Sequence, residues 1–190
     1  MQGIRLETSH VWGQEMIQAI YPGTFDPVHN GHVDIASRAS ALFDRLTVAV
    51  YDRPMKTLMF STQERMEMLR QALHHLPNVG VESYSSLTVE FARHLGARVI
   101  VRGLRVISDF ELEFQMALTN KKLAPDIEVV CLMTSQEYAF LSASTAKEVA
   151  MLGGCVSGMV PSHVEHALQS RLKALGQSGG DKVRIVSLRD

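Results

Sequence analysis

The sequence predicts an α/β fold: a single Rossmann-like domain in which a five-stranded parallel sheet is flanked by helices on both faces. Apolar runs suited to buried strands alternate about five times with segments whose apolar residues recur at helical spacing. The length of 190 residues is enough for one domain with its own hydrophobic core. Polar clusters follow several strand candidates, which is typical of parallel sheets that bind ligands at the carboxyl ends of their strands.

Five short apolar runs predict the strands, because each is bounded by polar, glycine or proline residues. The runs are residues 16–21, 46–51, 79–84, 98–101 and 128–133. Connections between parallel strands of one sheet are right-handed, so each intervening helix should cross over the sheet before the next strand begins.

Apolar residues at three- and four-residue steps predict helices over residues 33–43, 61–73, 88–95, 110–121, 147–152 and 161–175. Several helix ends carry sequence signals. Ser61 and Glu64 form a capping box at the start of the second helix. Ser108 or Asp109 can cap the fourth helix, and Pro161 suits the first position of the last one.

The two ends of the chain lack such patterns. Residues 1–14 show neither helical nor alternating periodicity, and we expect a flexible N-terminal extension there. The folded domain should occupy residues 15–175. Residues 176–190 contain a Gly-Gly pair among mixed charges and are predicted to form a mobile tail.

The composition is that of an ordinary globular protein, with 46% hydrophobic and 21% charged residues. Its 19 basic and 20 acidic side chains give a formal net charge of -1, which argues against a general affinity for nucleic acid. No apolar run approaches the roughly 20 residues that span a bilayer, and no signal peptide is recognised. We therefore expect a cytoplasmic protein without nucleic-acid or membrane partners.

Cys131 and Cys155 are the only cysteines. They show neither the spacing of a metal site nor a disulfide framework, which suits a reducing compartment. Both are expected to be buried packing residues.

Residues 21–32, Tyr-Pro-Gly-Thr-Phe-Asp-Pro-Val-His-Asn-Gly-His, form the predicted turn from the first strand into the first helix. Two prolines and two glycines shape a compact loop whose N–H groups can approach a ligand, and a helix N-terminus favours phosphate. The glycine patterns of P-loop ATPases and dinucleotide-binding folds are missing, which disfavours a redox Rossmann protein. The loop offers the imidazoles of His29 and His32 instead.

Other polar clusters also follow strands. Lys56 lies beyond the second strand, Arg102 and Arg105 beyond the fourth, and residues 138–144 beyond the fifth. Since the carboxyl ends of parallel strands share one edge of the sheet, these clusters and the loop over residues 21–32 should converge on one anion-binding site.

The linked motifs resemble a known family. His-x-Gly-His at residues 29–32 is similar to the signature of a nucleotidyltransferase superfamily. Within that superfamily, the chain resembles the bacterial phosphopantetheine adenylyltransferases. Four motifs carry this resemblance: Tyr-Pro-Gly-Thr-Phe-Asp-Pro at residues 21–27, Arg-Gly-Leu-Arg at 102–105, Asp-Phe-Glu at 109–111 with Glu113, and Lys-Glu-Val at 147–149. The resemblance runs from about residue 19 to about residue 173.

This resemblance implies adenylyl transfer from ATP to the phosphate of 4'-phosphopantetheine. The products would be dephospho-coenzyme A and pyrophosphate, in the penultimate step of coenzyme A biosynthesis. His32, Thr24, Lys56 and Arg102 would be the catalytic residues. The family resemblance also implies a homohexamer built from two trimers.

The resemblance assigns two sets of binding residues. The ATP site would comprise Thr24, Phe25, His32, Gly103, Leu104, Arg105, Glu113, Tyr138, Ala139, Phe140, Leu141, Ser142, Ala143 and Ser144. The phosphopantetheine site would comprise Thr24, Lys56, Leu87, Thr88, Arg102, Met116, Asn120 and Glu148. Family members usually carry a third serine where this chain has Ala143, so we expect retained activity with altered ATP affinity.

The residue types also suit such a reaction chemically. The acceptor is already a phosphate oxyanion, so the attack needs neither a general base nor a covalent intermediate. Catalysis then depends on placing two anions in line and on cations that neutralise charge at the α-phosphate. Mg²⁺ is expected to arrive with ATP, without a ligand from the protein.

The residues alone leave alternatives open. His29 and His32 are spaced as two metal ligands, although no third ligand is evident. The two arginines of residues 102–105 are placed to pair with Asp109 and Glu111. A sister nucleotidyltransferase with another acceptor, or a nucleotide-binding module without turnover, would use the same loop.

Overall fold

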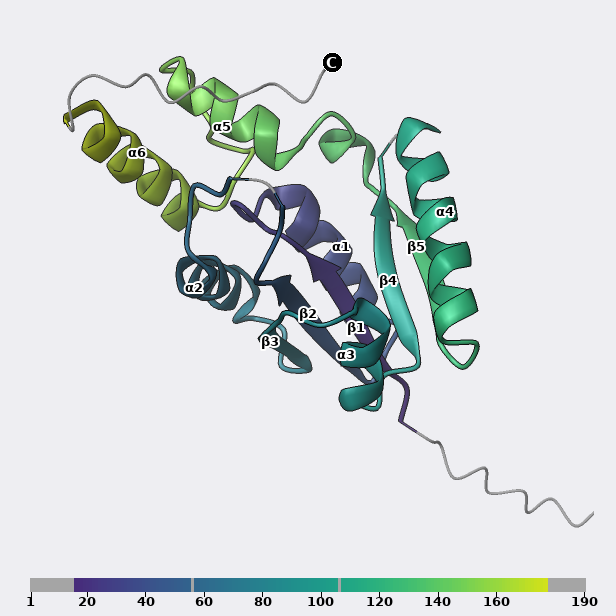
Figure 1. Ribbon diagram of the computed structural model, residues 1–190. Helices are drawn as coiled ribbons and strands as arrows, with labels where there is room; N and C mark the ends of the chain where they lie inside the picture. The colour runs from purple at the N-terminus through teal and green to yellow at the C-terminus, as the bar shows by residue number, and fades with distance from the viewer. Residues whose placement is uncertain (1–15, 56, 106, 178–190) are drawn as a thin grey trace, which may run out of the picture.

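The computed structural model describes residues 16–55, 57–105 and 107–177 and contains a five-stranded sheet. The strands are β1 (Gln18–Gly23), β2 (Arg45–Tyr51), β3 (Val79–Tyr84), β4 (Val99–Leu104) and β5 (Glu128–Met133). Neighbouring strands pair in parallel, and their order across the sheet is β3-β2-β1-β4-β5 (Figure 1). The predicted five-stranded parallel sheet is therefore confirmed.

Helices cover both faces of this sheet, as predicted (Figure 1). They are α1 (Asn30–Ser40), α2 (Thr62–Leu73), α3 (Thr88–His94), α4 (Ile107–Leu123), α5 (Ala143–Met151) and α6 (Ser162–Gln177), with a short 3-10 helix η1 (Gln136–Tyr138). One cluster of buried residues joins the sheet to α1, α2, α5 and α6, and a second cluster joins the opposite face to α3. The capping box predicted at the start of α2 is present.

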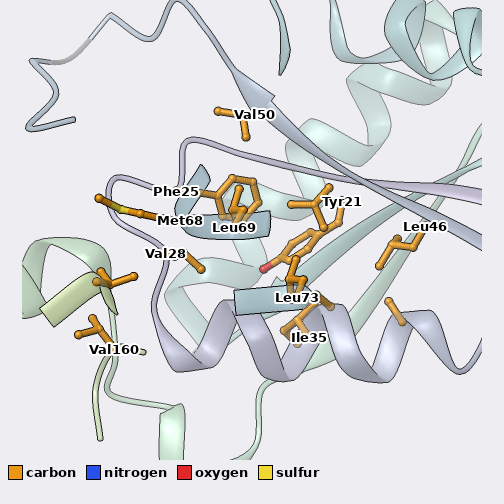
Figure 2. Packing of buried hydrophobic residues seen from close by; sticks show 14 of the residues in the cluster. Tyr21, Phe25, Val28, Ile35, Leu46, Val50, Met68, Leu69, Leu73 and Val160 are labelled. Carbon is orange, nitrogen blue, oxygen red and sulfur yellow. The ribbon is translucent and has the colours of Figure 1, made fainter. Parts of the chain in front are cut away.

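Side chains of β1 alternate between the two clusters, as strand geometry requires. Tyr21 belongs to the first cluster and Ile20 to the second. Figure 2 shows Tyr21 and Phe25 among the side chains of the first cluster, which also includes Ile35 of α1 and Leu69 of α2. The loop that follows β1 is therefore anchored in the core.

Two boundaries near β4 differ from the sequence prediction. β4 continues through residues 102–104, which still pair with β5, whereas the sequence prediction places them after the strand. α4 begins at Ile107, so Ser108 and Asp109 lie inside the helix and neither is its N-cap.

The last helix also differs slightly from its prediction. α6 begins at Ser162, one residue after Pro161, whose carbonyl oxygen accepts the N–H groups of Val164 and Glu165. It ends at Gln177, two residues beyond the predicted end. The predicted extension over residues 1–14 and most of the predicted tail, residues 178–190, lie outside the described residues.

The prediction that both cysteines are buried is wrong, because Cys131 and Cys155 are exposed. Cys131 lies on β5, an edge strand of the sheet, and Cys155 lies in the turn after α5, so packing around both is incomplete in the single chain. Within the described residues, no helix combines the length and apolar character needed to cross a membrane.

Candidate active site

The candidate site lies where the strand order of the sheet reverses. β1 and β4 are neighbours, but β1 leads into α1 on one face, whereas β4 leads into α4 beside α3 on the other. Connections that leave two adjacent parallel strands in opposite directions open a crevice at their carboxyl ends. The loop from β1 to α1 lies at this crevice.

This loop has a turn that few sequences tolerate. Phe25 has a positive φ of 52°, and its ring packs so closely against Gly23 that a Cβ there would lie 2.8 Å from Phe25 Cζ. Asp26 is buried and accepts the N–H groups of Met59 at 3.0 Å and Phe60 at 2.9 Å. A glycine at position 23 and a buried carboxylate at position 26 therefore fix the loop.

His29 and His32 form a reciprocal cap at the N-terminus of α1. The N–H of His32 donates to His29 Nδ1 at 3.3 Å, and the N–H of His29 donates to His32 Nδ1 at 3.2 Å. The ring centroids lie 3.5 Å apart in a stacked arrangement. Gly31 leaves room between them, because a Cβ there would lie 3.2 Å from the His29 ring, closer than an ordinary contact.

The cap also determines the chemistry of the two imidazoles. Burial, followed by the positive charge of Arg105, lowers the pKa of His29 to about 3, so its ring is neutral at neutral pH. In both residues Nδ1 accepts a hydrogen bond, so a neutral ring carries its proton on Nε2. His32 thereby has an Nε2–H donor at the helix N-terminus, which already favours anions.

Arg102 of β4 and Glu113 of α4 form a bidentate ion pair. Arg102 Nε donates to Glu113 Oε2 at 2.6 Å and Nη2 donates to Oε1 at 2.5 Å, while Nη1 donates to the carbonyl oxygen of Pro22 at 2.8 Å. Burial lowers the pKa of Arg102, but the hydrogen bond and the charge of Glu113 outweigh it and raise that pKa above its ordinary value. The guanidinium is a fixed cation at the end of β1, and its partner among the described side chains is Glu113 and not Glu111.

Two cavities open beside this ion pair. The first cavity has a volume of about 380 Å³ and lies between the β1–α1 loop, the start of α1 and the segment that enters α5. The second cavity, about 260 Å³, lies between the ends of β1 and β2, α3 and the middle of α4. They share five lining residues, Pro22, Gly23, Thr24, Arg102 and Glu113. The two cavities therefore adjoin, with Thr24 and the ion pair at their boundary.

Most residues predicted to bind ATP line the first cavity. They are Thr24, Phe25, His32, Gly103, Arg105, Glu113, Tyr138, Ser142, Ala143 and Ser144. Ser142 is the N-cap of α5 and accepts the N–H of Thr145 at 3.0 Å, so a second helix N-terminus borders the cavity. The other predicted ATP residues lie outside the lining: Leu104 and Leu141 are buried, Ala139 is partly buried and Phe140 is exposed.

Most residues predicted to bind phosphopantetheine line the second cavity, namely Thr24, Thr88, Arg102, Met116 and Asn120. Leu87, the N-cap of α3, and Glu148 of α5 are exposed and lie outside the lining. Lys56 lies outside the described residues.

Sequence reasoning missed several lining residues. Tyr21, Asp26 and Thr134 line the first cavity, while Tyr51 and Tyr84 line the second. Tyr51 and Tyr84 are the last residues of β2 and β3. A tyrosine at the carboxyl end of a buried strand was the available signal for both, since ligands bind at this edge of a parallel sheet.

The structure gives no support to a two-histidine metal site. His29 and His32 direct their Nδ1 atoms to backbone N–H groups. Within residues 16–55, 57–105 and 107–177, no group of three or more His, Cys, Asp or Glu side chains is arranged to hold a metal ion.

The fold and the site together define a class of protein. Two helix N-termini border one cavity, and a fixed arginine separates that cavity from a second one. Such an arrangement suits a polyphosphate ligand on one side and a second anionic ligand on the other. It is the arrangement expected of an α/β nucleotidyltransferase.

Comparison with known proteins gives the family. The family model described as Cytidylyltransferase-like matches residues 20–149. A phosphopantetheine adenylyltransferase of Roseiflexus sp. (strain RS-1) is 56% identical over 154 residues, which are 81% of this chain and 96% of the relative. One of Carboxydothermus hydrogenoformans is 53% identical over 158 residues, 83% of this chain and 98% of that relative. The chain belongs to the cytidylyltransferase-like family and, within it, to the phosphopantetheine adenylyltransferases.

A solved structure supports the fold as well. The structure of a putative nicotinate-nucleotide adenylyltransferase from Vibrio parahaemolyticus superposes with a TM-score of 0.60 at 16% identity, over 82% of this chain and 99% of that one. This likeness concerns the fold alone. The family and the nucleotidyltransferase class predicted from the sequence are confirmed.

Proposed function

We propose that the chain transfers the adenylyl group of ATP to the phosphate of 4'-phosphopantetheine. The products are dephospho-coenzyme A and pyrophosphate, and the reaction is the penultimate step of coenzyme A biosynthesis. The observation that carries this proposal is the pair of adjoining cavities that share Thr24 and Arg102. Membership of the phosphopantetheine adenylyltransferases identifies the two ligands.

The transfer is a direct in-line displacement. An oxygen of the acceptor phosphate forms a bond with the α-phosphorus of ATP, the bond from that phosphorus to the oxygen bridging to the β-phosphate breaks, and pyrophosphate leaves. No side chain has to remove a proton, because the attacking oxygen is already an anion. The site supplies positions and positive charge.

Each catalytic residue has a separate role in this proposal. Thr24, at the boundary of the cavities, contacts both reactants. The Nε2–H of His32 stabilises charge on the α-phosphate in the transition state. Arg102, held by Glu113, binds the acceptor phosphate with Lys56, which lies outside the described residues.

ATP occupies the first cavity in this proposal, and its triphosphate lies near the N-termini of α1 and α5. Phosphopantetheine occupies the second cavity, with its arm along Met116 and Asn120 of α4. Mg²⁺ enters as part of the ATP complex, where it neutralises charge on the triphosphate. Ligand roles for Leu87, Glu148, Leu104, Ala139, Phe140 and Leu141 stay predictions.

A pyrophosphate-release assay tests the proposal. The full chain with Mg²⁺-ATP and 4'-phosphopantetheine should release pyrophosphate, and His32→Ala should lower kcat about 10²- to 10³-fold, the usual effect of losing one preorganised donor. His75→Ala is the control, because His75 is an exposed histidine after the end of α2 and its loss should leave kcat unchanged. No pyrophosphate from the wild-type chain would contradict the proposal.

The same assay separates the alternatives. A sister transferase would release pyrophosphate with nicotinate mononucleotide in place of phosphopantetheine, or with CTP in place of ATP. A nucleotide-binding module would bind ATP without releasing pyrophosphate under any of these conditions.

We also propose a cytoplasmic homohexamer. Among the described side chains of α4 that line neither cavity, four apolar ones are at least half exposed in the single chain: Phe110, Phe114, Leu118 and Leu123. Several large apolar side chains exposed on one helix mark a surface that a partner normally covers. Packing of α4 between chains would cover this surface.

A further inference from the structure

Arg65 of α2 is a buried cation outside both cavities. It is fully buried, at 0% exposure, on the apolar stripe of α2 one turn before Leu69 and two turns before Leu73. Such a position is ordinarily filled by an apolar side chain, because a buried guanidinium destabilises the fold unless it is well paired. Its presence at this position therefore needs an explanation.

The hydrogen bonds of Arg65 go to loop and strand ends. Nη1 donates to the carbonyl oxygens of Thr24 at 2.7 Å and Tyr51 at 3.0 Å, and Nη2 donates to Thr62 Oγ1 at 2.8 Å. The guanidinium is thus oriented toward two backbone carbonyls, while its buried Nε donor has no hydrogen-bond partner among the described residues.

These two carbonyls end the strands that border both ligands. Thr24 follows β1 and lies at the boundary of the two cavities, and Tyr51 is the last residue of β2 and lines the second cavity. The Arg65 guanidinium therefore fixes the distance between Thr24 and Tyr51 in the wall of the second cavity. Arg65 itself lines neither cavity.

Arg65 also fixes one side of the strained turn. Phe25, with its φ of 52°, lies between the carbonyl of Thr24 and the carboxylate of Asp26. Asp26 is held by the N–H groups of Met59 and Phe60 and by Lys147 Nζ at 2.8 Å. A residue in this conformation persists only where the surroundings determine it on both sides.

We propose that Arg65 is a positioning residue for the transfer: it holds the Thr24 backbone in place, so that the Thr24 side chain reaches both reactants at once. This inference rests on the adenylyl transfer proposed above. Because Arg65 lines neither cavity, its loss should lower turnover far more than nucleotide affinity. Misplacement of a reacting group by about 1 Å can lower a rate about 100-fold.

The first test compares Arg65→Lys with Arg171→Lys in the pyrophosphate assay. Lysine keeps the charge but lacks the planar set of donors that reaches both carbonyls. We expect kcat to fall about 10- to 100-fold while KM for ATP changes less than about threefold. Arg171 is a matched control, because it binds the Met59 carbonyl at 2.8 Å and pairs with Glu64 in the same region without touching Thr24 or Tyr51. Arg171→Lys should lower the melting temperature and keep kcat.

The second test is a double-mutant cycle with Thr24→Ala. If Arg65 acts through the Thr24 side chain, Arg65→Lys should change kcat by less than about twofold once that side chain is gone, whereas independent effects would multiply. Should Arg65→Lys fail to fold, Thr62→Val replaces it in the cycle, because it removes the acceptor of Nη2, together with the hydrogen bond from the Thr62 hydroxyl to Asp52. We expect Thr62→Val to lower kcat about 3- to 10-fold in the wild-type background and not in the Thr24→Ala background.

Two results would overturn the inference. In the first, Arg65→Lys has the kcat of the wild type and only its melting temperature is lower. In the second, the loss of kcat in the double variant equals the product of the losses in the two single variants. Both are read against an active wild-type chain. An inactive wild-type chain would instead overturn the proposed function itself.

Discussion

His29 stays neutral inside the N-terminal cap of α1, and this makes stability depend on pH. Its pKa is about 3 in the folded chain against 6.5 ordinarily. Between these values the unfolded chain binds a proton at this position and the folded chain does not. The free energy of unfolding should therefore decrease by about 1.4 kcal/mol per pH unit as the pH falls below about 6.5. Above that pH, His29 should make no contribution to the pH dependence of stability.

Urea unfolding of His29→Asn checks this expectation. Asparagine keeps a capping acceptor and does not titrate. Between about pH 7.5 and about pH 5.5 the wild-type chain should lose about 1.4 kcal/mol more stability than the variant does. The exposed His75→Asn should follow the wild-type curve, and parallel curves for wild type and His29→Asn would contradict the burial of a neutral ring.

Ala143 is the first residue of α5 and stands where, by the resemblance described above, a serine is expected. It lines the first cavity next to the cap residue Ser142. A hydroxyl at this position adds a donor beside the proposed triphosphate, so Ala143→Ser should lower KM for ATP about 2- to 10-fold, the effect of one net hydrogen bond. KM for phosphopantetheine should not change. An unchanged KM for ATP would show that this hydroxyl is irrelevant here.

Single residues were predictable from the sequence where a motif marked them. Thr24, His32 and Arg102 line the cavities as the motifs suggested. Arg65 and Asp26 escaped notice, because their importance comes from backbone groups distant in sequence. The signal for Arg65 was a charge on the same helical stripe as Leu69.

At the scale of elements, the Arg102–Glu113 pair joins β4 to α4 between the two cavities. Glu113→Gln removes the charge that orients the guanidinium, so kcat for pyrophosphate release should fall about 10- to 100-fold. Loss of a hydrogen bond to a charged group should lower stability by about 1–3 kcal/mol.

A pair elsewhere serves as the control for this variant. Arg93 and Asp126 form a similar ion pair whose side chains are 46% and 58% exposed. Solvent screens exposed pairs, so Asp126→Asn should change neither kcat nor stability appreciably. Equal effects of Glu113→Gln and Asp126→Asn would show that the pair at the cavities has no special role.

Elements were predictable because buried strands and amphipathic helices leave local patterns. The carboxyl end of β4 could not be predicted in this way. Residues 102–104 belong to the strand because they pair with β5, which is distant in sequence. The Arg102–Glu113 pair was hidden for the same reason, because its spacing depends on how β4 turns into α4.

At the scale of the whole molecule, the order β3-β2-β1-β4-β5 brings the site together. The alternation of strands and helices predicts a parallel sheet but not which strands are neighbours. Only the contact of β1 with β4 places Thr24 beside Arg102 and makes one boundary between two cavities.

The proposed hexamer depends on the apolar surface of α4. Phe114 is 53% exposed and its ring stacks on that of Phe110. Phe114→Glu places a charge in the proposed interface and should reduce the mass measured by light scattering from six chains to fewer. Leu152→Glu is the control, because Leu152 is an exposed apolar residue after α5. A wild-type monomer would contradict the proposed assembly.

The stereochemical course at the α-phosphorus tests the central claim most directly. Two adjoining cavities allow the acceptor phosphate to attack ATP in one step, with no adenylyl group held by the protein. With ATP that is chiral at the α-phosphorus through a sulfur substituent, a single displacement gives product with inverted configuration, which is the result we expect. Retention would require two displacements through a covalent intermediate and would contradict the direct transfer.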